Sequence, residues 1–376
     1  MKIGLACRHF LSTKGGLEKY TLSISTELVR QGHEVHVFAH SGERVPGIHL
    51  HHVPFFPLSS PGKNLSFAYM AAKRISEFQM DVVQSMERLW DQDIFRASDG
   101  INPVQMEQRY PHPLVRGFKT ITPRRQVLTY LEKRIFCRNG ARFIMTNSQL
   151  VKDQICHHYG ISGEKIHVIY NSVDLQRYNI SVKEQLRRDV RNRYEIGEQD
   201  TLIFFAGNGF QLKGLSVVLE ALVGLNNPRI RLMVAGSDPV DPYRRWSERN
   251  GLGSAAIFLG YQKDLVPFYG AADLFVLPTQ YDPFANVCLE AMACGTPVIT
   301  TQMNGVSEII NSGYDGYVLL SRNPKELGAR ILDFSGHYDK NAFINRAAEK
   351  AATFTMDAHM RRLMDLYKLV CEAKRK

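Results

Sequence analysis

Apolar and polar residues follow two alternating periods along the first half of the chain. Lys2 to Cys7 and Glu34 to Ala39 are short apolar runs that predict β-strands. The segment between them predicts a helix that ends at Gly32, with one face made of Leu17, Thr21, Ile24 and Leu28. Further strands are predicted at Asp81 to Ser85, Arg142 to Asn147 and Lys165 to Ile169. Strands that alternate with amphipathic helices are typical of parallel βαβ units.

A second alternating series follows the turn Asn171-Ser172-Val173-Asp174 and a charged, helix-prone stretch from Lys183 to Arg193. Its predicted strands are Thr201 to Ala206, Ile230 to Ala235, Ala256 to Leu259, Leu274 to Leu277, Pro297 to Thr300 and Tyr317 to Leu319. The two series predict an α/β protein made of two doubly wound domains that face each other. Ligands of such sheets bind beyond the carboxyl ends of the strands, so we expect the site in the shared cleft.

Composition narrows the class of protein. A chain of 376 residues exceeds one comfortable core, and no apolar run reaches the roughly 20 residues that span a bilayer. Arg8 interrupts the first apolar run too early for a secretory signal. The six cysteines form no C-x-x-C pair, which favours reduced thiols in a cytoplasmic protein. The net charge of +10 favours an anionic partner.

The most informative segment runs from Thr279 to Pro297. It predicts a strand end, a loop that carries Asp282, and a helix that begins near Ala285 and carries Glu290. Free amides at the helix start, from Ala285, Asn286 and Val287, would suit a diphosphate. Asp282 would then accept hydrogen bonds from sugar hydroxyls, and Glu290 from ribose hydroxyls. Alternatively, Asp282 is an ordinary helix cap and Glu290 a solvated surface acid.

Together, several motifs resemble glycosyltransferase family 4 over nearly the whole chain. They are Gly15-Gly16-Leu17-Glu18, Asn171-Ser172-Val173-Asp174, the run from Phe258 to Thr301 with its acidic pair, Gly305 to Ile310, and Asp315-Gly316-Tyr317. The family usually has two glutamates at the spacing at which this chain has Asp282 and Glu290. The resemblance implies a GT-B fold and a retaining, metal-independent hexosyltransferase. It also implies no cofactor, because the donor substrate is a nucleotide-diphosphate sugar, expected to be UDP-linked and glucose-type.

The resemblance assigns roles to individual residues. Lys213, in the glycine-rich loop before a predicted helix, matches the lysine that neutralises the leaving diphosphate. The alternative, a solvated lysine at a helix start, is disfavoured by the helix dipole. The family's arginine just before it is replaced here by Gln211 or Leu212. Gly15 and Gly16 are expected against the diphosphate, and Asp99 near the reacting sugar carbon or as a turn former.

The GT-B resemblance also predicts the domains. Residues 1–172 form the acceptor-binding domain, completed by 357–376, and residues 173–356 form the nucleotide-sugar-binding domain. Periodicity alone leaves the domain of the last helix, about Met356 to Lys376, open. The acceptor is expected to be a glycan or glycolipid, with lipopolysaccharide core as first choice.

The first domain contains a strongly basic segment. Between Arg109 and Arg142 there are nine Lys/Arg residues and one acid, Glu132. The prolines at 111, 113 and 123 predict a loop before a helix. The segment is either a core helix with a solvated basic face or an anionic-membrane surface that holds the enzyme on the inner face of the cytoplasmic membrane. Its surface residues are Arg116, Lys119, Arg124, Arg125, Lys133, Arg134 and Arg138.

Other signals are interpreted without a metal. Asp91-Gln92-Asp93 is expected to be a pair of exposed loop acids, and His49, His51 and His52 to lie on a surface hairpin. Rival functions remain: a nucleotide-sugar epimerase or a glycogen-type synthase on the same architecture, and a catalytically inactive, basic nucleic-acid-binding protein on the same fold. Nucleic acid is not expected as a partner, because the basic segment has little aromatic interleaving.

Overall fold

The computed structural model describes residues 1–11, 15–56, 59–337 and 339–375. The chain forms two compact units. The first contains Met1–Tyr170 and Met360–Lys376, and the second contains Asn171–His359. The sequence placed these divisions within three residues, after 172 and before 357. The change in texture at the Asn171-Ser172-Val173-Asp174 turn therefore coincides with the change of unit.

The first unit contains a seven-stranded parallel sheet of order β5-β3-β1-β6-β7-β8-β9. Its strands are β1 (Lys2–Ala6), β3 (Glu34–Ala39), β5 (Ile48–His52), β6 (Val82–Ser85), β7 (Gln92–Arg96), β8 (Ala141–Thr146) and β9 (Ile166–Val168). A separate two-stranded sheet pairs β2 (His9–Phe10) with β4 (Ser41–Gly42). The central strands are buried on both faces, as expected of parallel sheets covered by helices.

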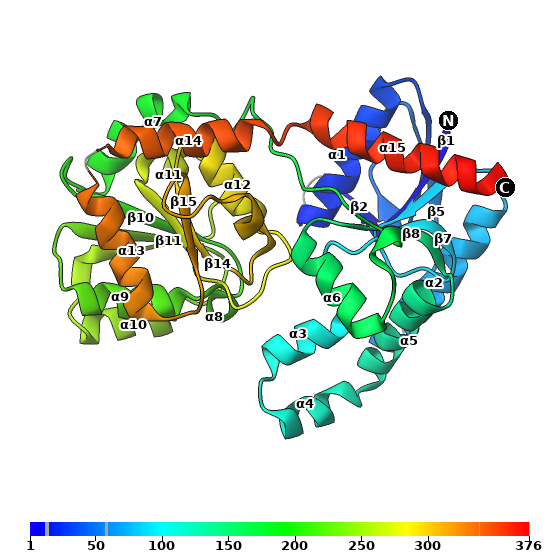
Figure 1. Ribbon diagram of the computed structural model, residues 1–376, viewed down its shortest axis with the longest axis horizontal. Helices are drawn as coiled ribbons and strands as arrows, with labels where there is room; N and C mark the ends of the chain where they lie inside the picture. Colours follow the sequence, from blue (N-terminus) through cyan, green and yellow to red (C-terminus); the bar gives the residue numbers. More distant parts are fainter. Residues whose placement is uncertain (12–14, 57–58, 338, 376) are drawn as a thin grey trace. The chain divides into compact units, whose positions relative to one another are not determined.

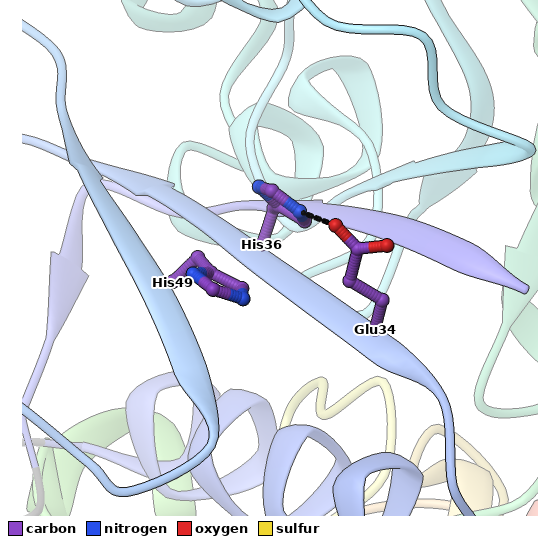
Figure 2. Close-up of side chains that lie close together, drawn as sticks. All are labelled: Glu34, His36 and His49. Carbon is purple, nitrogen blue, oxygen red and sulfur yellow. Dashed lines mark hydrogen bonds and ion pairs between the residues drawn. The ribbon is translucent and has the colours of Figure 1, made fainter.

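Two of these strands correct the sequence predictions. Asp93 is not an exposed loop acid: it lies in β7, is buried, and accepts a 2.8 Å hydrogen bond from the Val83 backbone. His49 does not belong to a hairpin, because β5 is an edge strand that pairs with β3 in parallel, and His49 lies beside His36 (Figure 2). Both errors have one cause: polar residues within a strand resemble loop residues in sequence.

The helices of the first unit are α1 (Gly16–Arg30), α2 (Ser60–Ser76), α3 (Asn102–Arg109), α4 (Pro113–Thr120), α5 (Pro123–Cys137), α6 (Gln149–Tyr159) and most of α15 (Met356–Arg375). The prediction of a loop before α5 is wrong, because α4 occupies that position. Pro113 and Pro123 each stand in the first turn of their helices. Proline is well tolerated there, since the first amides of a helix have no partner within it.

The carboxyl-terminal helix α15 returns the chain to the first unit. Leu363, Leu366, Tyr367 and Val370 are buried. The Tyr367 hydroxyl donates to the Gln84 side chain on β6, and Lys374 forms a 2.7 Å ion pair with Asp93. The last helix therefore supplies both apolar and polar contacts to the sheet of the first unit.

The second unit contains a six-stranded parallel sheet of order β12-β11-β10-β13-β14-β15. Its strands are β10 (Thr201–Ala206), β11 (Ile230–Ala235), β12 (Ala256–Gly260), β13 (Leu274–Leu277), β14 (Val298–Thr301) and β15 (Gly316–Leu319). Its helices are α7 (Ser181–Arg193), α8 (Phe210–Lys213), α9 (Leu215–Leu225), α10 (Asp241–Arg249), α11 (Val266–Ala271), α12 (Asn286–Ala293), α13 (Pro324–Gly336) and α14 (Lys340–Ala352). They lie on both faces of the sheet (Figure 1), with α9 and α13 on one side and α7, α12 and α14 on the other.

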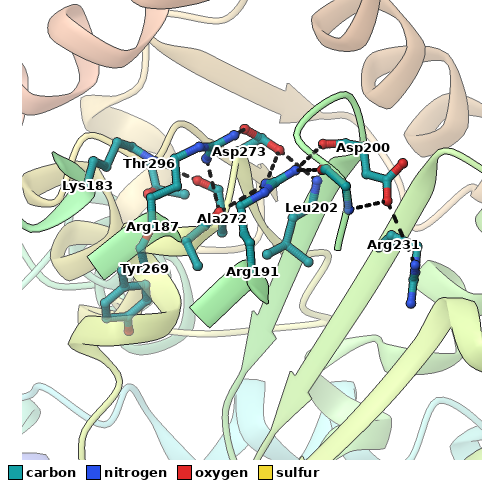
Figure 3. A network of polar contacts seen from close by, with 12 residues as sticks. Lys183, Arg187, Arg191, Asp200, Leu202, Arg231, Tyr269, Ala272, Asp273 and Thr296 are labelled. Atoms are coloured by element: carbon teal, nitrogen blue, oxygen red, sulfur yellow. Dashed lines mark hydrogen bonds and ion pairs between the residues drawn. The ribbon is translucent and has the colours of Figure 1, made fainter. Parts of the chain in front are cut away.

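The charged helix α7 is fastened to the second sheet by buried polar contacts (Figure 3). Lys183 donates a 2.6 Å hydrogen bond to the Ala272 carbonyl, and Arg187 and Arg191 reach the two oxygens of Asp273. Burial alone would raise the pKa of Asp273, but these two guanidinium groups outweigh it and lower the pKa. Burial also lowers the pKa of Lys183 to about 7. Helix α7 is therefore not merely a solvated charged helix.

Candidate active site

Two loops at the carboxyl end of the second sheet are tied together. The backbone N–H of Gln280, after β13, donates a 2.7 Å hydrogen bond to the Leu212 carbonyl, after β10. Gly214 follows Leu212 with a φ of +89°, and a Cβ there would lie 2.2 Å from the Pro278 carbonyl oxygen. Only glycine fits this close approach. The loop that carries Lys213 is therefore held against the loop that carries Asp282.

The candidate residues Lys213 and Asp282 form an ion pair in the second unit. Lys213 is the last residue of the one-turn helix α8, and the next residue, Gly214, is the N-cap of α9, so Lys213 precedes a helix as the sequence predicts. Asp282 also accepts a 3.1 Å hydrogen bond from the Phe284 backbone. The carboxylate therefore binds the backbone of the turn before α12 and also neutralises the lysine.

The start of α12 carries part of the predicted anion seat. Asn286 and Val287 open the helix, where backbone N–H groups have no partner within the helix, and Asn286 is exposed. The prediction for Ala285 is wrong: its amide is not free but donates a 3.1 Å hydrogen bond to the side chain of Asn304, which is fully buried. Asn304 follows β14 and also binds the Val306 amide and Thr300. Of the three expected amides, those of Asn286 and Val287 therefore remain available to donate hydrogen bonds to an anion.

Glu290, on α12, is partly buried rather than a solvated surface acid. Its carboxylate accepts a 3.1 Å hydrogen bond from the hydroxyl of Tyr269, which is fully buried on α11. Burial raises the pKa of Tyr269 far above its ordinary value, and the charge of Glu290 raises it further. The hydroxyl is therefore a permanent donor that orients Glu290.

A further arginine braces the same loops. Arg322, after β15, donates a 2.9 Å hydrogen bond to the Gln211 carbonyl and a 3.2 Å hydrogen bond to the Gln280 side chain. Sequence reasoning missed it, because it lies more than a hundred positions after the loop that it contacts. It brings a second positive charge to the loop that contains Lys213.

In the first unit, the predicted residues lie at the carboxyl end of the sheet or next to it. Gly15 is the N-cap of α1 and is exposed, with an ordinary φ of −62°. Gly16 opens the helix. Asp99 is exposed and lies three positions after the end of β7, and its backbone carbonyl accepts a 2.7 Å hydrogen bond from the side chain of Gln105. Because any residue can adopt this φ, backbone conformation does not explain a glycine at position 15, and its lack of a side chain is the remaining explanation.

Sequence reasoning missed a charged cluster next to Asp99. Arg8, after β1, forms a 3.1 Å ion pair with Glu87, after β6. Burial raises the pKa of Glu87, although Arg8 and Arg88 lower it, and the charge of Asp99 adds to the increase. Arg96, at the end of β7, is buried over the ring of Tyr20. The position of Glu87 immediately after a predicted strand was the available signal, because ligands bind where parallel strands end.

The basic segment is only partly a surface. Lys119, Arg124, Lys133 and Arg138 are exposed. Two of the predicted surface residues point inward instead: Arg125 donates to the Asn102 side chain, and Arg134 covers the ring of Trp90 at 4.3 Å. Arg116 is partly buried and 4.0 Å from Glu107. The acid of the segment, Glu132, is fully buried and paired with Arg88, so it does not offset the surface charge.

Apolar side chains accompany these charges. On α4 and just after it, Leu114 is 71% exposed, Phe118 78% and Ile121 64%. Beside them, a cavity of about 620 Å³ is lined by Leu65, Tyr69, Trp90, Pro123, Gln126, Val127 and Tyr130. Exposed apolar residues next to basic ones are typical of helices that lie in a membrane interface. Among the described residues, no helix is long and apolar enough to cross a membrane.

Two family models match the chain. The model for glycosyl transferases group 1 matches residues 187–351, and the model for Glycosyltransferase Family 4 matches residues 14–177. A probable transglycosylase of Burkholderia thailandensis is 31% identical over 317 residues, covering 82% of this chain and 80% of that protein. The lipopolysaccharide glucosyltransferase WaaG of Escherichia coli is 25% identical over 313 residues, covering 81% and 82%.

Solved structures agree on the fold. The crystal structure of WaaG superposes with a TM-score of 0.79 at 22% identity, covering 97% of this chain and 98% of WaaG. The structure of HepE from Anabaena, in complex with UDP and glucose, superposes with a TM-score of 0.70 at 19% identity and covers all of both chains. With two Rossmann-like units and matches over most of its length, the chain belongs to glycosyltransferase family 4 and is a glycosyltransferase of the GT-B fold.

Proposed function

We propose that the protein transfers a hexose, with retention of anomeric configuration, from a UDP-linked sugar to a glycan or glycolipid. Lipopolysaccharide core is the proposed acceptor. The observation that carries the proposal is the Lys213–Asp282 pair beside the start of α12. An ammonium, a carboxylate and the first amides of a helix therefore lie within one set of loops, which supports binding of a diphosphate and a sugar there. The names of two relatives support the choice: WaaG is a lipopolysaccharide glucosyltransferase, and HepE was solved with UDP and glucose.

In this proposal the second unit binds the donor. The diphosphate accepts hydrogen bonds from the amides of Asn286 and Val287, and Lys213 turns from Asp282 to the phosphate oxygens. Asp282 is then released to bind a sugar hydroxyl, and Glu290, oriented by Tyr269, binds the ribose. Lys213 and the dipole of α12 supply the positive charge that a bound metal ion supplies in metal-dependent transferases. This supports metal-independent transfer without a cofactor.

The proposed chemistry is a front-side substitution. The bond from the anomeric carbon to the diphosphate breaks, and the bond to the acceptor oxygen forms on the same face. The departing phosphate oxygen takes the acceptor's proton, so charge and atoms balance. The enzyme contributes positioning and charge stabilisation. The anomeric configuration of the product, measured by NMR, decides this point, because an inverted product would contradict it.

The first unit is proposed to bind the acceptor. Glu87 and Arg8 offer a partly buried hydrogen-bonding pair beside Asp99, which suits acceptor hydroxyls or phosphates. The exposed apolar face of α4, with Lys119 and Arg124, supports peripheral attachment to the inner face of the cytoplasmic membrane. Each basic residue near an anionic bilayer contributes about 1 kcal/mol.

Thermal unfolding with a panel of nucleoside diphosphates and nucleotide-sugars tests the donor site. A ligand at about 100 times its Kd stabilises the native state by about 2.7 kcal/mol, which raises the unfolding midpoint. We expect UDP and UDP-glucose to raise it, and Lys213→Ala and Glu290→Ala to abolish the increase. Lys263→Ala, an exposed lysine of the same unit, is the matched control and keeps it.

Two outcomes would contradict the proposal. The absence of a shift with any nucleotide would show that the loops no longer bind a donor. A UDP-sugar that is converted to its epimer without an acceptor would show an epimerase instead.

A further inference from the structure

A cluster of metal-ligating side chains lies at the edge of the first sheet, apart from the residues used above. Glu34 and His36 point from the same face of β3, and His49 follows on the edge strand β5 (Figure 2). His36 and His49 are register partners in the parallel pair, so their side chains leave the sheet on the same side. The sheet therefore brings together three residues that span fifteen positions of the sequence.

The geometry of the cluster suits one small cation. Nε2 of His36 lies 2.8 Å from Oε1 of Glu34, and the rings of His36 and His49 stack with centroids 4.7 Å apart. One ligand atom from each of the three residues lies within 4.8 Å of the other two. Zinc ligands lie about 2.0–2.2 Å from the metal, so binding requires the side chains of Glu34 and His49, both exposed, to adjust around the buried His36.

The buried member of the cluster is already oriented by a neighbour. Nδ1 of His36 lies 2.8 Å from Nε2 of His51, and the two rings are nearly coplanar, with an interplanar angle of 5°. A histidine that binds a metal through one nitrogen usually donates its other N–H to a fixed partner, which sets its tautomer and ring orientation. His51 is such a partner, and it leaves Nε2 of His36 directed to Glu34.

One cation competes with a metal at this position. Lys2 lies 3.1 Å from Glu34, whereas Arg74 is paired with Glu77. A bound cation must displace Lys2 from the carboxylate. This exchange is feasible because both side chains are partly exposed, at 34% and 49%.

From these contacts we propose that Glu34, His36 and His49 bind Zn²⁺ and thereby fasten the edge strand β5 to β3. Two imidazoles and one carboxylate match the ligand preference of zinc, with water in the fourth position. The role is structural rather than catalytic, because Glu34 opens β3 at its amino end whereas the candidate active-site residues follow the carboxyl ends of strands.

Titration calorimetry with ZnCl₂ on the full chain tests the site. Cys137 is an exposed thiol, so the measurements use a Cys137→Ser background. We expect one zinc ion per chain, and binding at least about tenfold weaker in Glu34→Gln and in His49→Ala. His52→Ala is the matched control: His52 is an exposed histidine of the same strand, outside the cluster, and its replacement leaves the affinity unchanged.

A second measurement separates loss of binding from loss of folding. Zinc should raise the unfolding midpoint of the background protein and of His52→Ala, but not that of His49→Ala. Because Glu34, His49 and His52 are all exposed, we expect the variants to fold. Their unfolding midpoints without metal check this. Zinc binding that survives in His49→Ala or Glu34→Gln, or that is lost equally in His52→Ala, would overturn the proposal.

Discussion

At the scale of single residues, buried polar groups decide how charged segments behave. The stretch from Lys183 to Arg193 is helix-prone by sequence, and its charges suggest a solvated helix. Three of its basic residues instead point to the sheet and meet Asp273 or the carbonyls around it. Asp273, one position before β13, is the reason, because its buried carboxylate needs positive partners.

The buried ammonium of Lys183 predicts a pH-dependent stability. Its pKa is about 7 in the folded protein, against about 10.4 in an unfolded chain. Between these values the unfolded state binds the extra proton, so stability increases as pH rises, by at most about 1.4 kcal/mol per pH unit. Urea unfolding at pH 7 and pH 9 should show this increase in the native chain but a smaller one in Lys183→Met. Lys263→Met is the control, and equal slopes in all three proteins would contradict the assignment.

At the scale of elements, α4 shows how a short helix can be hidden by composition. Pro113, Gly117 and the basic residues around them suggest a loop, yet the segment forms two turns whose apolar side chains face outward. An isolated helix of this length is marginal in water. Its apolar face has no buried residue, which is consistent with a partner such as a membrane interface.

Helix α4 therefore predicts two separable contributions to membrane binding. Phe118→Ser removes exposed apolar area that the membrane would bury. We expect co-sedimentation with anionic liposomes to weaken about tenfold, since burial of an aromatic side chain contributes about 1.5–3 kcal/mol. Lys119→Glu should weaken binding to anionic vesicles and reduce its sensitivity to salt, because one of the attractive charges that salt screens is lost. Tyr261→Ser, an equally exposed aromatic in the second unit, is the control. Equal binding of all variants to neutral and anionic vesicles would exclude the electrostatic mechanism.

At the scale of the whole molecule, the chain ends in the unit in which it began. The last helix contributes five buried apolar side chains to the first unit, those of Met360, Leu363, Leu366, Tyr367 and Val370, together with the Tyr367–Gln84 hydrogen bond. Burial of that many side chains contributes roughly 1.5–3 kcal/mol each, which is comparable to the total stability of a domain. The first unit is therefore not complete at Tyr170.

Truncation after His359 should thus destabilise one unit selectively. We expect residues 1–170 to become sensitive to limited proteolysis, while the second unit stays resistant and still binds the nucleotide. Mass spectrometry of the fragments identifies which unit is cut. Deletion of residues 372–376 is a milder control, because it leaves all five buried side chains in place. Cleavage spread evenly over both units would contradict the separate contribution of the helix.

Sequence alone determined the parts of this protein that depend on local pattern. Strands such as Glu34 to Ala39 and Thr201 to Ala206 agree with the structure to the residue, because a buried parallel strand is a continuous apolar run bounded by polar turns. The family was also readable, since its motifs place Lys213, Asp282 and Glu290 at fixed spacings. The roles of those residues remain predictions.

Tertiary structure decided which polar residues meet. Asn304 accepts a hydrogen bond from the amide of Ala285, and Arg322 donates one to the Gln211 carbonyl. Glu87 pairs with Arg8. The two partners of each contact are at least 19 positions apart in sequence. The same holds for Asp93 and for the cluster of Glu34, His36 and His49. Hydrophobic periodicity reports the burial of one element at a time, whereas a polar contact depends on which strands the fold places side by side.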